Sequence, residues 1–213
     1  MEFAPRLEGK QLSEAMRLIG EIDVFKGHWH KLQEIRPEKL AQLRRVTTIE
    51  SAGSSTRIEG AELSDQEVAR VLEGLSVESF RARDESEVRG YGELLQIIFE
   101  NHREITFDEN HIKQLHKILL SHSAKDEAHR GEYKKQENHV EARHPDGRVE
   151  VIFRTASPFD TPRLMAEQVQ KTAAAFESDE VHPLAAIARF IVAFLAIHPF
   201  KDGNGRLSRA LTT

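Results

Sequence analysis

The 213-residue chain lacks cysteine, a long apolar run and an excess of positive charge. Without cysteine it has no disulfide, no thiolate metal site and no cysteine nucleophile. Its most apolar stretch, residues 184–197, is shorter than the about 20 residues that a membrane-spanning helix needs, and its first residues lack the apolar segment of a signal peptide. With 30 Lys and Arg against 35 Asp and Glu, the formal charge of −5 argues against nucleic acid or anionic membrane as a partner. We therefore expect a cytoplasmic protein.

Most of the chain carries helical patterning. Its 39% hydrophobic and 31% charged residues suit one large globular domain, or one and a half. Apolar side chains recur every three or four positions in residues 8–24 and 39–50. Gly53, Ser54 and Ser55 interrupt the second pattern, so we expect a kink or a new helix start there. Capping signals predict the later helices.

The capping signals are of two kinds. Capping boxes at residues 64–67 and 106–109 each predict a helix start. Thr161, as an N-cap before a proline, and Pro183 predict two more helices, of which the last is apolar and ends at His198. A helical protein is therefore expected almost throughout.

One stretch departs from the helical pattern. Between Asn138 and Phe159, β-branched and aromatic residues flank the turn signal Pro145-Asp146-Gly147. We expect a short β-hairpin there. Because an isolated hairpin is marginally stable in water, it must pack on the helices or on a partner.

The segment 198–209, with the sequence HPFKDGNGRLSR, concentrates groups suited to phosphate chemistry. Pro199 cannot continue the apolar helix, so His198 is held at the exit of a rigid element. Residues 203–205 tolerate positive φ, and their successive N–H groups can form an anion-binding concavity. A short helix is expected from Arg206 onward.

The side chains of this segment agree with such a site. Arg206 and Arg209 share a helix face and can both reach phosphate oxygens. Asp202 is an oxygen ligand of the kind that Mg²⁺ uses together with phosphates, and His198 has the ordinary pKa of a general base. Taken singly, each has an ordinary explanation as a helix cap, a turn or a solvated face. Their joint occurrence favours phosphoryl or nucleotidyl transfer.

The same segment resembles the signature HPFx[D/E]GNGRxxR of the Fic (Fido-fold) family, and every fixed position is matched. Upstream, residues from about 84 to 197 resemble the helical core of that family and its hairpin flap. The resemblance implies a mainly α fold, with a Fic core over residues 81–213 that is cut short at its C-terminal end. A helical region over residues 1–80 would precede the core. Phe200 would be a packing anchor.

The resemblance also implies an activity, protein adenylylation: transfer of AMP from ATP to a Ser, Thr or Tyr hydroxyl of a target protein, with release of pyrophosphate. The target would dock on the 138–159 hairpin by strand addition. The implied roles are a general base at His198, a Mg²⁺ ligand at Asp202, a phosphate cradle at Gly203, Asn204 and Gly205, a β-phosphate contact at Arg206 and a γ-phosphate contact at Arg209.

A second motif precedes the core. Ser55, Glu59 and Gly60 resemble the inhibitory motif [S/T]xxxE[G/N] of the Fic class with an N-terminal inhibitory helix. A glutamate that pairs with Arg209 would make this arginine unavailable to the γ-phosphate. From spacing alone, an exposed glutamate before a glycine cap is the other interpretation. The resemblance therefore implies autoinhibition by Glu59.

Other functions stay open at this point. The same site could remove AMP, with Glu59 positioning a water, or transfer another phosphate-containing group. A non-catalytic helical regulator is a further alternative, although the acidic balance argues against DNA binding by this region. A metal hydrolase is disfavoured because none of the eleven histidines lies in an HExxH motif. Homo-oligomerisation is compatible with the sequence.

Overall fold

A computed structural model of the chain describes residues 7–35, 37–75, 82–144, 147–178 and 180–213. Within these ranges the protein is mainly helical and has one antiparallel hairpin, as the sequence predicts. The elements in chain order are α1 (Gly9–Ile35), α2 (Pro37–Ile58), α3 (Asp65–Leu72), α4 (Ala82–Asn101), α5 (Glu109–Leu119), the 3₁₀ turn η1 (Ala124–Asp126), β1 (His139–Arg143), β2 (Val149–Arg154), α6 (Thr161–Glu177), α7 (Pro183–Ile197) and α8 (Asn204–Ala210).

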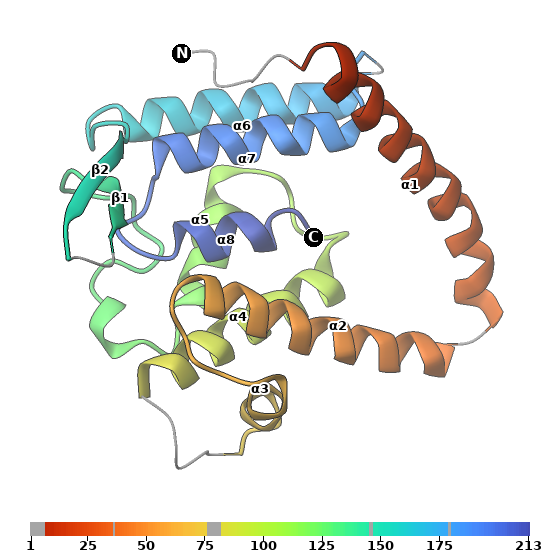
Figure 1. Cartoon of the computed structure of the whole chain (residues 1–213), viewed down its shortest axis with the longest axis horizontal. Helices are drawn as coiled ribbons and strands as arrows, with labels where there is room; N and C mark the ends of the chain where they lie inside the picture. Colours follow the sequence, from red (N-terminus) through yellow and green to blue (C-terminus); the bar gives the residue numbers. More distant parts are fainter. Residues whose placement is uncertain (1–6, 36, 76–81, 145–146, 179) are drawn as a thin grey trace.

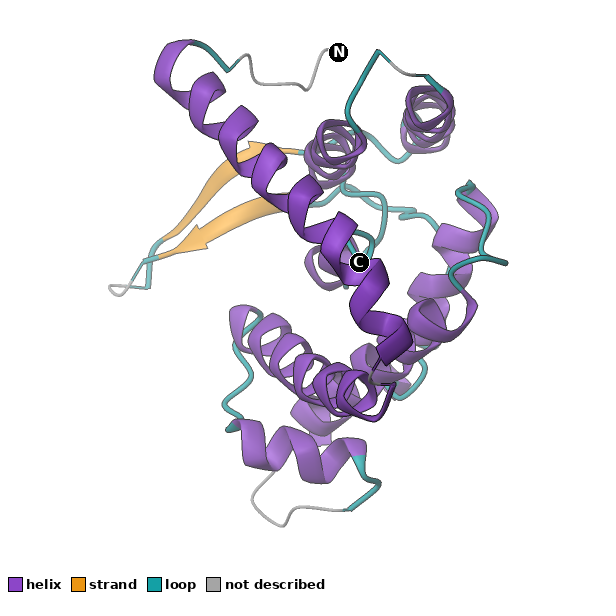
Figure 2. Ribbon diagram, turned by 90° about the vertical axis from the view of Figure 1, so that its right-hand side faces the viewer, coloured by secondary structure: helices purple, strands orange, loops and turns teal. Residues whose placement is uncertain are grey.

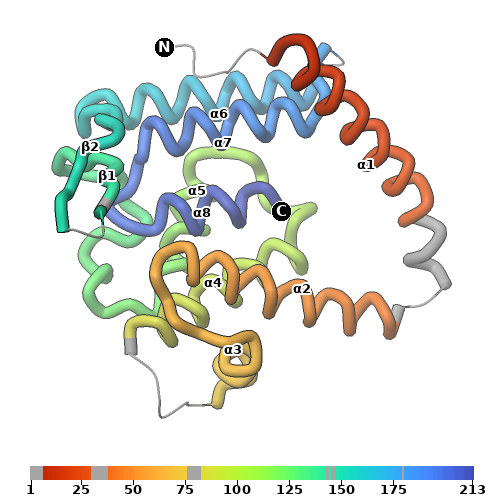
Figure 3. Tube along the Cα trace, in the orientation of Figure 1, coloured from red at the N-terminus to blue at the C-terminus, as the bar shows by residue number. Residues whose placement is uncertain are grey.

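The short helix α8 lies at the centre of the helical body. It packs against α2, α4, α5 and α7, so residues far apart in the sequence meet around it (Figure 1). Helices α6 and α7 run side by side along one edge, and α4 packs between α2 and α5. Helix α1 extends from the start of α2 toward the loop between α6 and α7 (Figure 3). Oδ2 of Asp23 in α1 lies 3.1 Å from Nε2 of His182, which precedes α7.

The hydrophobic core surrounds the loop between α7 and α8. Phe200, in this loop, is fully buried, and its ring stacks on that of His116 from α5 with centroids 3.7 Å apart. Phe194 of α7 and Leu207 of α8 are also fully buried. The expected role of Phe200 as a packing anchor agrees with this position.

The hairpin projects from the helical body (Figure 2). Strands β1 and β2 pair with a register shift between Val140 and Glu141, and every residue of β2 is exposed. Pro145 and Asp146 of the predicted turn lie outside the described residues, whereas Gly147 has a φ of 85°. The predicted hairpin is confirmed.

Helix α2 runs without a break to Ile58, so the predicted kink or restart at residues 53–55 is wrong. The guanidinium of Arg57 lies over Gly53, where a Cβ would stand 2.8 Å from Nη1. Arg57 also donates to the carbonyl of Leu63 (2.7 Å) and to the carboxylate of Asp65 (2.9 Å). These bonds tie the end of α2 to the start of α3.

Helix starts agree with the sequence in part. The capping box at residues 64–67 forms and opens α3. The expected box at residues 106–109 does not cap α5, because Asp108 is its N-cap and accepts a hydrogen bond from the His111 amide at 2.8 Å. Thr161 is the first residue of α6 and not its N-cap.

The ends of α7 and α8 also differ from expectation. Helix α7 ends at Ile197, and α8 begins at Asn204, two residues before the predicted start. It begins early because, of residues 203–205, only Gly203 takes a positive φ (79°). Helix α7 is also less buried than its apolar sequence predicts, since Val192 is 41% exposed.

No helix in the described part of the chain is both long and apolar enough to cross a membrane. The boundary between an N-terminal region over residues 1–80 and a core over residues 81–213 stays a prediction.

We expect Gly90→Ala to destabilise the protein, because a Cβ at this position of α4 would lie 2.1 Å from the carbonyl oxygen of Leu119. Overpacking of this kind costs about 1–3 kcal/mol, measurable by urea unfolding. Gly20→Ala in α1 is the matched control, because a Cβ there meets nothing within 4 Å. Equal effects of the two substitutions would contradict the close crossing of α4 and α5.

Candidate functional site

His198 caps the C-terminal end of α7 in the left-handed conformation, with a φ of 53°. It is the one non-glycine residue with positive φ in the described ranges. Its Nδ1 lies 3.3 Å from the Leu195 carbonyl, which favours a proton on Nδ1 and leaves the lone pair on Nε2. Burial lowers the pKa of His198 below its ordinary value, so the imidazole is neutral at pH 7. A neutral ring with a free lone pair is the form that accepts a proton.

Asn204 closes the loop that follows His198. Its side-chain oxygen accepts from the Phe200 amide at 2.9 Å, and its Nδ2 donates to the Phe200 carbonyl at 2.7 Å. Because this side chain is buried and bonded to both the amide and the carbonyl of Phe200, we expect Asn204 to contact a phosphate through its backbone. Glycine suits position 203 because its φ of 79° is one that other residues rarely adopt, and a Cβ there would lie 3.2 Å from the Leu119 side chain.

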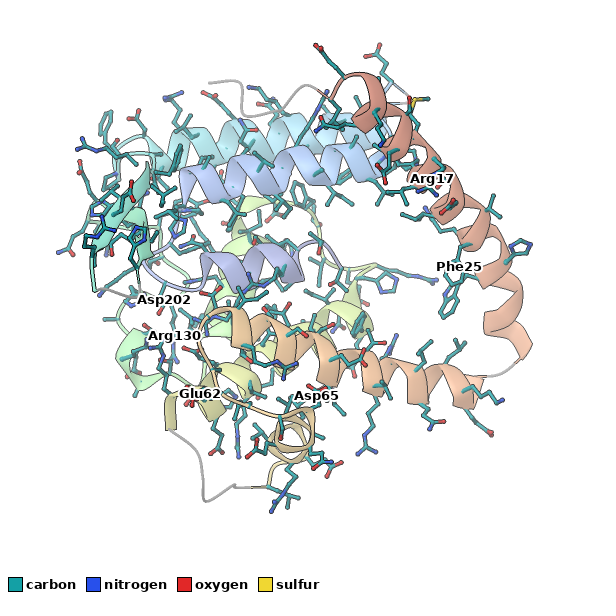
Figure 4. The ribbon with its side chains drawn as sticks, viewed as in Figure 1. Arg17, Phe25, Glu62, Asp65, Arg130 and Asp202 are labelled. Atoms are coloured by element: carbon teal, nitrogen blue, oxygen red, sulfur yellow. The ribbon has the colours of Figure 1, made fainter. Side chains whose placement is uncertain are left out.

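Asp202 lies at the hairpin end of α8 (Figure 4) and is held as a carboxylate. Burial raises its pKa, but Arg206, the Gly203 amide and Lys125 outweigh burial and hold the pKa of Asp202 below its ordinary value. The Gly203 amide donates to Oδ1 at 2.6 Å, and the Lys125 ammonium lies 3.2 Å from Oδ2. A partly exposed carboxylate fits one ligand of a Mg²⁺ ion that takes its other ligands from phosphates and water. In the described ranges no cluster of three His, Asp or Glu side chains could hold a metal alone.

Arg206 is buried between two carboxylates. Its Nη2 lies 3.2 Å from Asp202, and its Nη1 lies 3.4 Å from Glu87 of α4. Glu87 also accepts from Nε of Arg83 at 2.8 Å. Glu87 was not among the residues predicted from the sequence, although its spacing from the buried Tyr91 and Leu94 places a charge on the inner face of α4. This carboxylate orients Arg206 and offsets its charge.

Arg209 is bound by Ser55 of α2 and by Glu59, which follows the last residue of α2. Its Nε donates to the Ser55 hydroxyl at 2.8 Å, and its Nη2 donates to Glu59 Oε1 at 2.7 Å and to the Ser55 carbonyl at 3.1 Å. Glu59 also lies against the first turn of α8, where a Cβ on Gly205 would be 2.5 Å from Oε1. The structure thus brings Ser55 and Glu59 of the upstream motif to Arg209 of the downstream motif.

His116 is a second structural residue of the site. The Gly131 amide donates to its Nδ1 at 2.8 Å, so the proton is on Nε2 and is donated to the Asp202 carbonyl at 2.9 Å. Burial lowers the pKa of His116 to about 4. The sequence shows that His116 lies on the inner face of α5, but it does not show the hydrogen bond of His116 to the loop between α7 and α8.

Residues 106–213 match the family model of the Fic/DOC family. The chain belongs to the Fic/DOC family. No curated protein matches it. The location of the match means that all residues of the downstream motif, from His198 to Arg209, lie inside the Fic domain.

Solved structures resemble this Fic protein over most of its length. A Fic domain containing signaling protein from Bacteroides thetaiotaomicron is 27% identical, with a TM-score of 0.75 and coverage of 89% of this chain and 69% of that one. A Fic family protein from Desulfovibrio desulfuricans is 25% identical, with a TM-score of 0.73 and coverage of 98% and 58%. Fic-1 from C. elegans, at 22% identity and a TM-score of 0.59, shares the fold. The chain thus spans about three fifths to two thirds of these proteins.

We expect the stability of this Fic domain to fall in acid through His116. Its pKa is about 4 in the folded protein and about 6.5 in the unfolded chain, so the unfolded chain binds more protons between these values. The contribution is present above pH 6.5 and is lost as the pH falls. It amounts to about 2 kcal/mol between pH 7 and pH 5.

Urea unfolding at these two pH values measures the difference. His116→Gln, which has no group titrating in this range, should show a loss smaller by that amount. The same pH dependence in both proteins would refute the assignment to His116.

Proposed function

We propose that this Fic protein transfers AMP from ATP to a hydroxyl side chain of a target protein and that Glu59 restrains the reaction. The observation that carries the proposal is the pairing of Glu59 with Arg209, next to a neutral histidine and an arginine held at the same loop. Membership of the family supports nucleotidyl transfer. The arrangement supports a site that recognises a triphosphate and is blocked by a carboxylate.

Each residue around the loop has a separate role in the proposed reaction. Nε2 of His198 takes the proton of the target hydroxyl, and the hydroxyl oxygen attacks the α-phosphorus. The bond between the α-phosphorus and the oxygen that bridges it to the β-phosphate breaks, and pyrophosphate leaves. The loop amides at Gly203, Asn204 and Gly205 would bind phosphate oxygens, for which the Gly203 amide has to release Oδ1 of Asp202. Arg206 contacts the β-phosphate, and Arg209 contacts the γ-phosphate.

Asp202 is the residue that would hold Mg²⁺. The ion, when bound, neutralises charge on the phosphate oxygens. Lys125, which contacts the same carboxylate, has to release Oδ2 before a metal can use that oxygen.

The restraint follows from the chemistry of Arg209. A guanidinium that donates to Ser55 and Glu59 cannot offer the same N–H groups to a γ-phosphate. The carboxylate of Glu59 also repels a polyphosphate. We assign the chain on this basis to the Fic class with an N-terminal inhibitory helix, in which residues 1–80 form a regulatory region before a core at residues 81–213.

The hairpin is the proposed docking element for the target. Both strands are short and mostly exposed, and the backbone of β2 lies at the edge of a two-stranded sheet. An extended segment of the target that adds to this edge would place its hydroxyl near His198.

We expect Glu59→Gly to raise AMP transfer by roughly tenfold to hundredfold, the equivalent of one charge-assisted hydrogen bond. Incorporation of label from [α-³²P]ATP with Mg²⁺ into a cell lysate measures the rate. Glu62→Gly is the matched control, because Glu62 is exposed and lies three residues further along the chain. Label in the Glu59→Gly reaction at or below the level of the unmutated protein would contradict the restraint.

We expect His198→Ala in the Glu59→Gly background to lower transfer by about 100-fold or more, because loss of a general base has an effect of this size. ATP affinity, measured by calorimetry, should be unchanged, since the imidazole acts on the acceptor. His102→Ala, at an exposed residue just after α4, serves as the control. An unchanged transfer rate would refute the assignment of the base.

Removal of AMP at the same site is the second outcome to test. A carboxylate at the position of Glu59 could orient a water toward a bound phosphoester. Incubation of the unmutated protein with a target labelled by the Glu59→Gly variant distinguishes the two reactions. Release of AMP that Glu59→Gly fails to produce would favour removal.

A further inference from the structure

The loop that carries His198 is held by two residues that precede the hairpin. All four consecutive carbonyls from Ile197 to Phe200 accept hydrogen bonds from Lys134 or Asn138. The Lys134 ammonium binds Ile197 (2.9 Å) and its amide binds Pro199 (2.8 Å). The Asn138 side chain binds His198 (3.3 Å) and Phe200 (2.9 Å). The backbone from the last residue of α7 to Phe200 is therefore hydrogen-bonded at every carbonyl.

The residue that follows β2 also binds Lys134 and Asn138. Thr155, the first residue after β2, accepts from the Lys134 ammonium at 2.9 Å, and its hydroxyl lies 2.7 Å from the Asn138 carbonyl. Lys134 also donates to Asn138 Oδ1 at 2.7 Å. All three donors of this buried ammonium are thereby satisfied. Lys134, Asn138 and Thr155, here called the hairpin-foot cluster, connect both strands to the His198 loop.

The hairpin-foot cluster stabilises the left-handed conformation of His198. A non-glycine residue in the left-handed conformation costs about 1 kcal/mol or more and persists only where its surroundings impose it. His198 has this conformation, and its own carbonyl and both flanking carbonyls are bound by the cluster. Core packing of Phe200 anchors the loop from the other side.

We propose that Lys134, Asn138 and Thr155 are positioning residues that fix the imidazole of His198 for proton transfer and link its position to the hairpin on which the target docks. The inference rests on the proposed function, since it gives His198 the role of base. It assigns a task to a buried lysine that does not reach the phosphate site.

The charge of Lys134 has a separate effect. Burial is the main cause of the lowered pKa of His198, and the Lys134 ammonium lowers it further. The other charged groups that act on the imidazole, Glu59 and Asp202, favour its protonated form. Burial also lowers the pKa of Lys134 itself, to about 8, so that the ammonium is still charged at pH 7. Lys134 therefore adds to the effect of burial, which favours the neutral imidazole.

The test compares variants of the cluster in the Glu59→Gly protein. We expect Thr155→Val and Lys134→Met to lower kcat for AMP transfer by about tenfold or more, because a misplacement of about 1 Å has effects of this order. KM for ATP should stay within about twofold, because the cluster binds no phosphate. Thr155→Ser, which keeps the hydroxyl, should restore kcat. Lys135→Met, at the exposed neighbouring lysine, is the control and should match the parent.

A second measurement requires no transfer activity. NMR titration of labelled histidine, with the His198 signal identified by His198→Ala, should show a higher pKa for His198 in Lys134→Met and an unchanged one in Lys135→Met. If the parent transfers no AMP but this shift is present, the proposed reaction fails while the linkage of Lys134 to His198 stands.

Three results would overturn the inference: an unchanged kcat in Thr155→Val, a loss of kcat that Thr155→Ser does not restore, or an unchanged pKa of His198 in a folded Lys134→Met. Thermal unfolding establishes that each variant is folded. If Lys134→Met does not fold, Thr155→Val and Thr155→Ser decide the test alone.

Discussion

The burial of Phe200 is the constraint on which the rest of the site depends. Its ring stacks on His116 and fills the core between α5 and α7, so the backbone of the loop cannot move without opening the core. This fixed residue separates two halves of the chemistry. His198 lies before it at the end of α7, and the arginines follow it on α8. One buried aromatic side chain thus sets the geometry between a proton acceptor and an anion site.

Around this loop, each arginine is paired with at least one carboxylate. Arg206 lies between Asp202 and Glu87, and Arg209 is bound by Glu59. The two pairs differ in burial. The Arg206–Glu87 pair is almost fully buried, whereas the side chains of Arg209 and Glu59 are each about one third exposed. An exchange of Glu59 for a phosphate is therefore possible without disturbing the core.

The sequence predicted the parts of this site that lie within a few residues of each other. The density of the segment 198–209 singled out His198, Asp202 and the two arginines as candidates, and the spacing of Ser55 and Glu59 indicated a partner for Arg209. It could not predict the contacts made by Glu87, His116 and Lys134, because these depend on how helices far apart in sequence cross. The wrong kink at residues 53–55 has the same origin, since Arg57 supports Gly53 only once α2 meets α3.

The central claim is that a triphosphate replaces Glu59 at Arg209 and presents its α-phosphorus to His198. A crystal structure of the Glu59→Gly protein with Mg²⁺ and a non-hydrolysable ATP analogue tests this most directly. We expect the γ-phosphate on Arg209, the β-phosphate near Arg206 and the α-phosphorus on the side of the loop that faces Nε2 of His198. A triphosphate bound away from Arg209, or an α-phosphorus that a hydroxyl beside His198 cannot reach, would contradict it.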